Sequence, residues 1–257
     1  MTPPPCPAEF EWIAREAGWT LVCRALEPRH GWTTRGLALP GADEPGSSDW
    51  PRLATDAGLA PERIVRLRQV HGADVVEART GLTNGGRAAD ALVSRDPGVL
   101  LTVRVADCVP LLIADRSLGA VAAVHAGWRG TGAGVAQRAV EAMIGTFGCR
   151  VADLAAALGP SIGPCCYEVG SAVRDALQEA GWSEAAIQRW FTGPLSGRLN
   201  LWRANQDQLI EAGLDVGAVF TSGLCTACHA GWFHSYRREK ERAGRMAAYI
   251  RAAAAPP

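Results

Sequence analysis

The chain has no excess of charge of either sign, because 26 Lys and Arg residues balance 26 Asp and Glu residues. A neutral chain lacks the basic surface that attracts nucleic acid or a membrane, so neither is expected as a partner. It also has no apolar run long enough to span a bilayer. Its first residues do not combine a basic segment with an apolar one, as a secretory signal would. We therefore expect a cytoplasmic protein.

Cysteine and histidine are both sparse. Eight cysteines in 257 residues are too few for a disulfide scaffold, and in a reducing compartment they are thiols or metal ligands. The five histidines are too few to supply the several copper centres of a multicopper oxidase. The sequence therefore argues against copper oxidation chemistry of that kind.

The composition is that of a folded globular protein, with 48% hydrophobic and 20% charged residues. We predict a disordered Pro-rich tail over residues 1–8 and a single domain over residues 9–257. Strand-like and helical segments alternate without a regular rhythm, which favours one mixed α/β domain over a barrel. The pattern predicts strands at 19–26, 62–70, 89–93, 154–158 and 216–221, helices at 135–147, 169–180 and 201–212 with Asn200 as a cap, loops at 40–51 and 84–86, and either a strand or a helix from Met246 onward.

The segment from Val99 to Gly134 organises the rest of the chain. Three apolar runs, at 99–105, 109–114 and 120–124, are typical of buried strands. Asp107 and Cys108 separate the first two runs, and His125 directly follows the third. Such side chains at strand ends are well placed for chemistry on a rigid scaffold, although a buried thiol and a core histidine are the more usual outcome.

Together with His71, these residues supply two imidazoles and a thiol. Three ligands of this kind leave one tetrahedral position open, as in a catalytic zinc site. The same ligands also occur in blue-copper sites. A third interpretation needs no metal, with Cys108 as a nucleophile and His125 as its base. The spacing alone does not choose between zinc and the Cys/His pair.

A glycine-rich run follows His125 and leads into the helix expected at 135–147. Backbone N–H groups there can hold a phosphate, with Arg129 as a bidentate clamp. The spacing matches neither a dinucleotide-binding nor a nucleoside-triphosphate loop. The alternative is that these glycines only permit close packing of strand and helix.

Further cysteines form a second group of candidates. Cys225 and Cys228 make a C-x-x-C pair beside His229, and Cys165 and Cys166 are adjacent elsewhere. No second C-x-x-C completes a four-ligand set, and a thioredoxin-like context is missing. We therefore expect a structural role for this group.

Several motifs together resemble the laccase-domain family, also called the polyphenol oxidase or YfiH-like family. The resemblance runs from Ile64 to Met246. The motifs are Gln69-Val-His71-Gly, Ala89-Asp90-Ala-Leu-Val, Ala106-Asp107-Cys108-Val-Pro110-Leu-Leu, His125-Ala-Gly-Trp-Arg129-Gly-Thr, Leu158-Gly-Pro-Ser-Ile162-Gly-Pro-Cys-Cys-Tyr167-Glu168-Val-Gly, Cys225-Thr226, Ser235-Tyr236-Arg237-Arg238 and Gly244-Arg245.

The resemblance implies a layered α/β/β/α fold and a zinc ion bound by His71, Cys108 and His125. It implies a purine nucleoside phosphorylase that splits adenosine, inosine or methylthioadenosine with phosphate into a base and a sugar 1-phosphate, and that also deaminates adenosine. A proposed role in editing peptidoglycan precursors, and the older label of polyphenol oxidase, belong to the same family.

From these implications we expect Cys108, His125 and Asp107 to be catalytic, and Arg129, Arg35 and Arg237 to bind phosphate. The expected partners are a nucleoside and phosphate, and the expected assembly is a monomer or a weak homodimer. Thr33-Thr34-Arg35 matches the family, but the segment from Gly36 to Leu53 departs from it, which leaves the substrate open. A cysteine hydrolase and a non-catalytic metal- or nucleoside-binding protein are the alternatives.

Overall fold

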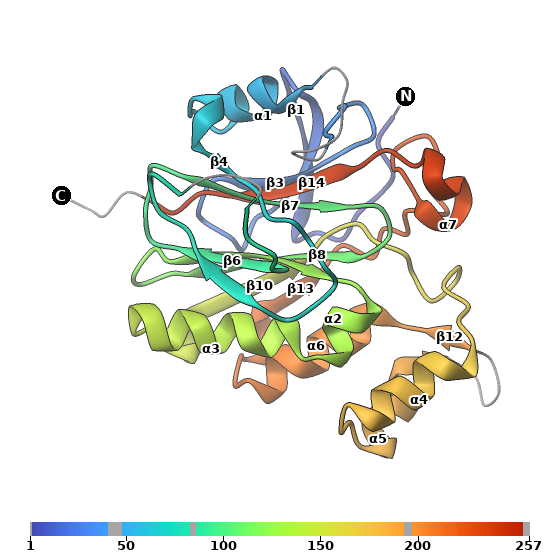
Figure 1. The fold of residues 1–257 in the computed structure, drawn as a ribbon. Coiled ribbons are helices and arrows are strands. Elements are labelled where there is room, and N and C mark those ends of the chain that lie inside the picture. Colours follow the sequence, from blue (N-terminus) through green and yellow to red (C-terminus); the bar gives the residue numbers. More distant parts are fainter. Residues whose placement is uncertain (1, 41–47, 83–85, 193–196, 254–257) are drawn as a thin grey trace.

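The structure is a computed structural model, and it describes residues 2–40, 48–82, 86–192 and 197–253. The expected loop at 40–51 and turn at 84–86 lie partly outside these residues, as does the end of the chain. Two six-stranded sheets and seven α-helices account for most of the part that is described. Figure 1 shows the sheets stacked face to face, with α3 and α6 beneath them and α1 above.

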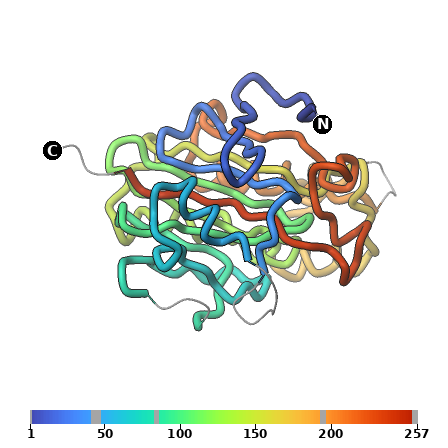
Figure 2. Tube along the Cα trace, turned by 90° about the horizontal axis from the view of Figure 1, so that it is seen from above, coloured from blue at the N-terminus to red at the C-terminus, as the bar shows by residue number. Residues whose placement is uncertain are grey.

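The first sheet combines strands from both ends of the sequence. Its spatial order is β1 (Phe10–Arg15), β2 (Gly18–Cys23), β3 (His30–Thr33), β14 (Met246–Ile250), β7 (Leu100–Val105) and β4 (Ile64–Val65). All neighbours are antiparallel except β4 and β7. Figure 2 looks down on this sheet, with the N-terminal segments nearest the viewer and β14 crossing the molecule.

The second sheet has the order β13 (Val219–Thr221), β10 (Leu154–Leu158), β8 (Val109–Asp115), β9 (Val121–Ala126), β6 (Ala91–Ser94) and β5 (Val75–Glu77). The four inner strands pair antiparallel. Each edge strand runs parallel to its neighbour, β13 to β10 and β5 to β6. A separate ribbon pairs β11 (Phe191–Thr192) with β12 (Arg198–Leu199).

The helices are α1 (Trp50–Asp56), α2 (Trp128–Gly132), α3 (Val135–Phe147), α4 (Ser171–Glu179), α5 (Glu184–Trp190), α6 (Leu201–Glu211) and α7 (Tyr236–Glu239). Asn200 caps α6 as predicted, accepting a hydrogen bond from the backbone N–H of Arg203 at 3.0 Å. Short 3-10 turns cover Pro61–Arg63, Val151–Asp153, Val216–Ala218 and Lys240–Arg242. None of the described helices is both long and apolar enough to cross a membrane.

The central strands are apolar on both faces because each face has its own core. In β8, Leu112 packs between the two sheets, while the neighbouring Leu111 faces the helices with Met143 of α3. In β7, Leu100 turns outward to the cluster beneath α1. Successive side chains of a strand point to opposite faces, so continuous apolar runs require cover on both sides. The layered mixed α/β fold is confirmed.

Two predicted strands are shorter than their apolar patterns. Only Ile64–Val65 of the expected strand at 62–70 pairs in a sheet. Further along, Arg68 forms an isolated bridge with Ala88, and the N–H groups of residues 70–72 donate to the Asp90 carboxylate. Residues 216–218 form a 3-10 turn held by the Asp215 side chain, and the strand begins at Val219.

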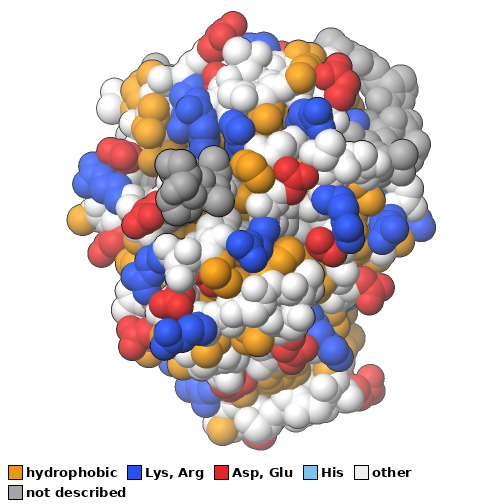
Figure 3. Space-filling model, turned by 90° about the vertical axis from the view of Figure 1, so that its left-hand side faces the viewer, with side chains coloured by type: hydrophobic (Ala, Val, Ile, Leu, Met, Phe, Trp, Pro, Cys, Tyr) orange, Lys and Arg blue, Asp and Glu red, His pale blue; other side chains and the backbone are white. Residues whose placement is uncertain are grey.

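The N-terminal residues contact the first sheet. Trp12 Nε1 donates to the Pro4 carbonyl at 2.9 Å, and Pro4 is buried. The expected division into a tail at 1–8 and one domain at 9–257 stays a prediction. Lys and Arg side chains are interspersed with Asp and Glu on the face drawn in Figure 3, as the balanced composition leads one to expect.

Candidate metal centre

Three separate loops and strand ends bring His71, Cys108 and His125 together. Cys108 lies in the turn that leaves β7 in the first sheet and enters β8 in the second. His125 lies near the end of β9, opposite Pro110 of β8. His71 belongs to the loop between β4 and β5 and has a left-handed backbone, with φ of 61°.

The ligand atoms of the three side chains lie within 4.8 Å of one another. The two imidazole rings are 4.9 Å apart between centroids and meet edge to face, at 73°. His125 is 3% exposed, while His71 is exposed. The predicted trio therefore converges, with one side open to solvent.

Asp90 fixes the two histidines. This fully buried carboxylate, one residue before β6, accepts hydrogen bonds from the backbone N–H groups of His71 at 2.9 Å and Gly72 at 2.7 Å. It also lies 2.8 Å from His125 Nδ1. If Nδ1 carries the proton, the other ring nitrogen, Nε2, is left as a ligand atom. The sequence contained Asp90 within a motif but gave no signal of this role.

The electrostatics of the trio favour the thiolate. Burial opposes ionisation of Cys108, but the charge of His125 and hydrogen bonds from His125 and His71 outweigh it and lower its pKa to about 6. Burial likewise opposes protonation of His125, yet the Cys108 charge and the Asp90 hydrogen bond raise its pKa to about 9. A thiolate is the form of cysteine that binds metals and that acts as a nucleophile.

Two glycines make room for this arrangement. A Cβ on Gly127 would lie 2.9 Å from Cys108 Sγ and 3.1 Å from His71 Cδ2, and one on Gly130 would lie 2.9 Å from the carbonyl oxygen of Gly72. Gly127 and Gly130 therefore serve close packing of α2 against the ligand-bearing loops, the second of the two roles expected for the glycine run. The donor set, two imidazoles and a thiolate held by a buried carboxylate, fits a zinc ion with an open coordination position.

The centre opens into a cavity of about 690 Å³ with a basic lining. Arg129 and Arg237 both reach it, with their guanidinium groups 4.3 Å and 5.2 Å from the ring centres of Trp128 and Tyr167 respectively. The other lining residues outside the trio are Gln69, Arg104, Ala106, Asp107, Tyr236, Lys240 and Arg245. Sequence reasoning had not singled out Arg104 or Lys240 and had given Gln69 no role beyond its place in a motif, because these residues are brought together only by the fold.

Asp107 also lines the cavity, and its carboxylate is hydrogen-bonded to the segment 226–237. It accepts hydrogen bonds from Thr226 Oγ1 at 2.5 Å, Ser235 Oγ at 3.1 Å and the backbone N–H of Arg237 at 2.6 Å. Its backbone φ is 96°. These contacts tie the start of α7, and with it Arg237, to the turn that carries Cys108.

The structure does not bring Arg35 to this cavity. Its guanidinium donates to the Ala230 carbonyl and lies 3.3 Å from Glu239 Oε1, and it lines a different cavity with His234 and Asp49. Of the three arginines expected to bind phosphate, Arg129 and Arg237 therefore share the cavity and Arg35 does not.

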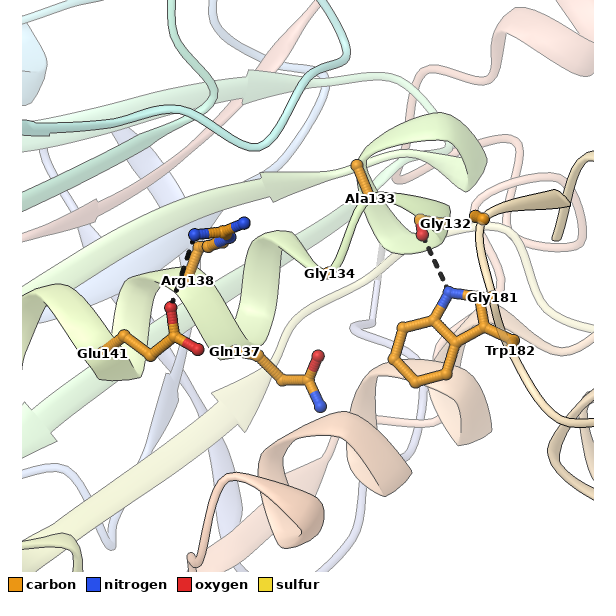
Figure 4. Close-up of a pocket in the computed structure, with 9 residues that line it drawn as sticks. Gly132, Ala133, Gly134, Gln137, Arg138, Glu141, Gly181 and Trp182 are labelled. Carbon is orange, nitrogen blue, oxygen red and sulfur yellow. Dashed lines mark hydrogen bonds and ion pairs between the residues drawn. The ribbon is translucent and has the colours of Figure 1, made fainter.

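A second hollow of about 460 Å³ lies beside α2 and α3 (Figure 4). Its lining includes Gly132, Gln137 and Trp182, and Trp182 Nε1 donates to the Gly132 carbonyl at 2.8 Å. Arg138 is paired there with Glu141 at 3.7 Å. This lining contains no thiol or imidazole, unlike that of the first cavity.

Fold and site together define a mixed α/β protein with an open His₂Cys centre at the edge of an arginine-rich cavity. Residues 42–253 match the family model described as multi-copper polyphenol oxidoreductase laccase, and the chain belongs to this family. The expected laccase-domain, YfiH-like family is thereby confirmed.

Its curated relatives are named for purine nucleoside chemistry. A purine nucleoside phosphorylase of Deinococcus radiodurans is 40% identical over 235 residues, which cover 86% of this chain and 88% of the relative. Purine nucleoside phosphorylase YlmD of Geobacillus stearothermophilus is 37% identical, with coverage of 77% and 76%. Adenosine deaminase RL5, of an unknown prokaryote, is 33% identical, with coverage of 75% and 76%.

Solved structures agree with the fold. The crystal structure of YlmD from Geobacillus stearothermophilus has a TM-score of 0.79 at 30% identity, covering 96% of this chain and 100% of that one. The hypothetical protein YfiH of Bacillus licheniformis has a TM-score of 0.79 at 27% identity, with coverage of 91% and 96%. The family and these relatives support a role in processing purine nucleosides, with a candidate metal site at His71, Cys108 and His125.

Proposed function

We propose that this protein is a zinc-dependent purine nucleoside phosphorylase that also deaminates adenosine. Its substrates would be adenosine, inosine or methylthioadenosine together with phosphate, and its products a free base and a sugar 1-phosphate. We place it in the cytoplasm, as a monomer or a weak homodimer. The names of its relatives support this substrate class.

The observation that carries the proposal is the position of the three ligands beside the cavity. His71, Cys108 and His125 lie in the wall of a cavity of about 690 Å³, within the usual size range of small-molecule sites. The same wall carries Arg129 and Arg237. Ligands for a Lewis acid and groups that bind an anion are therefore available to one substrate.

His71, Cys108 and His125 would hold the zinc ion, with Asp90 keeping both imidazoles in place. When bound, zinc supplies a Lewis acid that polarises an oxygen and lowers the pKa of bound water. Arg129 and Arg237 would bind phosphate through paired N–H donors. Asp107 would hold Arg237 at the cavity through the backbone bond described above.

The first test combines metal analysis with product detection. We expect purified protein to contain zinc and to convert each nucleoside, with phosphate, into base and sugar 1-phosphate that chromatography resolves. Adenosine without phosphate should yield inosine. Cys108→Ala should lose zinc from this centre and at least about 100-fold in kcat/KM, because a tetrahedral site cannot keep its affinity with two protein ligands. Full turnover after complete chelation would overturn the metal mechanism.

The phosphate role has a separate test. Arg129→Gln and Arg237→Gln should each raise the KM for phosphate by about 10-fold or more, since a charge-assisted hydrogen bond contributes about 1.5–3 kcal/mol. Arg138→Gln is the matched control, because Arg138 pairs with Glu141 in the second hollow. An equal effect in all three variants would remove the specific assignment.

One observation favours a second candidate, a cysteine hydrolase acting on an amide or a peptidoglycan precursor. Cys108, His125 and Asp90 form a thiol–imidazole–carboxylate series, and the lowered pKa of Cys108 suits a nucleophile. This candidate predicts a covalent adduct on Cys108 and activity that survives metal removal. Nucleoside binding without any product would instead indicate a non-catalytic binding protein.

A further inference from the structure

Four cysteines from two distant segments meet away from the candidate metal centre. Cys165 and Cys166 follow β10, and Cys225 and Cys228 follow β13. Their sulfur atoms lie within 4.8 Å of one another. Cys228 Sγ is 3.6 Å from Cys165 Sγ and 3.5 Å from Cys166 Sγ. His229, which the sequence placed beside this group, is not part of it.

The backbone around the cluster is itself fixed by hydrogen bonds. Ser161 bridges the two segments, because its N–H donates to the Leu224 carbonyl at 3.1 Å and its carbonyl accepts from the N–H of Thr226 at 3.0 Å. The backbone N–H of Gly163 points at Cys225 Sγ at 3.2 Å. An N–H group directed at a sulfur stabilises a thiolate, so Cys225 is positioned as an anionic ligand.

We propose that Cys165, Cys166, Cys225 and Cys228 bind one zinc ion in a closed tetrathiolate site. With Zn–S bonds of about 2.3 Å, the sulfur atoms of a tetrahedral site are about 3.8 Å apart, close to the separations seen here. Four protein thiolates leave no open position, so this site is structural. It is distinct from the His₂Cys centre in ligands and in place.

The geometry distinguishes this site from a pair of disulfides. A disulfide joins two sulfurs at about 2.05 Å. Here Cys228 lies near both Cys165 and Cys166, and all four thiols are free. Cys165 and Cys228 are exposed, so packing of apolar sulfur in a core does not account for their convergence.

The bound ion would join the two segments that complete the cavity wall. Tyr167, which lines the cavity, directly follows Cys166. Thr226, which donates to Asp107, directly follows Cys225. Positions 165 and 228 are 63 residues apart, so the link closes a long loop and restricts the unfolded chain accordingly.

The test is the zinc content of purified full-length variants, measured by elemental analysis. Cys108→Ser should retain one zinc per chain at the cluster. The double variant Cys165→Ser, Cys166→Ser should lose this zinc whether or not the other centre is occupied. Cys6→Ser removes a partly buried thiol outside both groups and should keep the wild-type content. This readout does not depend on nucleoside turnover, so failure of the proposed function would leave it intact.

A second measurement tests the proposal without the double variant, in case that variant does not fold. In folded Cys108→Ser protein, an organomercurial titrant should release one zinc per chain as the cluster thiols react, with a chromophoric chelator reporting the release. Cobalt loaded into the same variant should show thiolate-to-cobalt charge transfer and the visible bands of tetrahedral cobalt. Zinc absent from Cys108→Ser, or disulfides among these four residues in mass mapping without reductant, would overturn the proposal.

Discussion

Asp90 shows how one buried carboxylate can hold ligands that come from different segments. Its two oxygens meet the backbone N–H groups of residues 70–72 and the ring of His125. Removing one acceptor oxygen would leave a backbone N–H group or the imidazole N–H without its partner. The positions of the candidate ligands therefore depend on a residue outside the ligand set.

We predict that Asp90→Asn weakens metal binding at this centre by about 10- to 100-fold, the range for residues that orient metal-bound histidines. Competition with a chromophoric chelator measures the affinity. Asp96→Asn is the matched control, because Asp96 also accepts backbone N–H bonds, from Thr80 and Gly98, but outside the cavity. Unchanged affinity in Asp90→Asn would show that the backbone alone sets the ligand geometry.

At the residue scale, the sequence indicated the candidate metal ligands more clearly than the residue that holds them in position. The chemistry of His71, Cys108 and His125 is visible in their side chains, and the family resemblance joined them. Asp90 accepts mainly from backbone N–H groups, which every residue except proline has, so the sequence does not mark these partners. Arg35 illustrates the converse, because its motif suggested phosphate while the fold gives it Glu239 as a partner.

The short helix α7 is held by a cluster of charges around Glu239. Arg35 Nη1, Arg238 Nη2 and His234 Nδ1 lie 3.3, 2.7 and 3.2 Å from its carboxylate. Burial opposes its ionisation, but Arg238, His234 and Arg35 together lower its pKa from 4.5 to about 2. Arg237, the second residue of this helix, lines the cavity, so the cluster helps to place that side chain.

We predict that Glu239→Gln lowers the free energy of unfolding by about 1–2 kcal/mol at neutral pH. Because the pKa of the folded state is the lower one, the stabilisation is complete above about pH 4.5 and is lost as the pH falls towards about 2. Urea denaturation of both proteins across this range measures it.

The difference between wild type and Glu239→Gln should therefore shrink with acid. Glu11→Gln serves as control, since Glu11 forms an exposed pair with Arg24 and should change stability little. A difference that stays constant down to pH 2 would mean that packing, and not charge, accounts for the role of Glu239.

At the element scale, the longest apolar patterns gave the right bounds. The predicted helix at 135–147 and strand at 154–158 match α3 and β10. β1, β3 and α5 were not predicted, because polar residues interrupt their apolar ones. The expected strand at 62–70 was too long because its second half leaves the sheet, where Arg68 bridges only Ala88 and the N–H of Val70 donates to the Asp90 carboxylate.

Across the whole molecule, Trp32 joins the two sheets. It is 2% exposed in β3, and its Nε1 donates to the carbonyl of Pro110 in β8 at 3.0 Å. A Cβ on Gly159 would lie 2.1 Å from the same nitrogen, so the second sheet is shaped around this ring. Pro110 lies two residues after Cys108, which places this contact close to the candidate metal centre.

We predict that Trp32→Phe lowers the free energy of unfolding by about 1–3 kcal/mol, because it opens a small cavity and removes one of the two donors of the buried Pro110 carbonyl, which keeps only the N–H of Gly159. Chemical denaturation measures the loss. Trp19→Phe, at a side chain that is 38% exposed, should change stability by less than about 0.5 kcal/mol. Equal effects in the two variants would contradict a special role for the link between the sheets.

The layered architecture was accessible from sequence chiefly through the family resemblance. Apolar runs such as 109–114 indicate a strand covered on both faces, but they do not say whether helices or another sheet cover it. The pairing of β3 with β14, from opposite ends of the chain, depends on the packing of the whole molecule. Local sequence patterns do not predict which distant strands pair with each other.

His71 occupies a backbone conformation, φ of 61°, that suits glycine better than a residue with a Cβ. The backbone of His71 is therefore locally strained, and a glycine at this position would make the folded protein more stable. His71→Gly should raise the free energy of unfolding of the metal-free protein by up to about 1 kcal/mol while weakening metal binding, and denaturation after chelation measures this. Directed evolution for thermal stability alone would favour this substitution. A screen for thermally stable variants therefore has to select for metal binding as well.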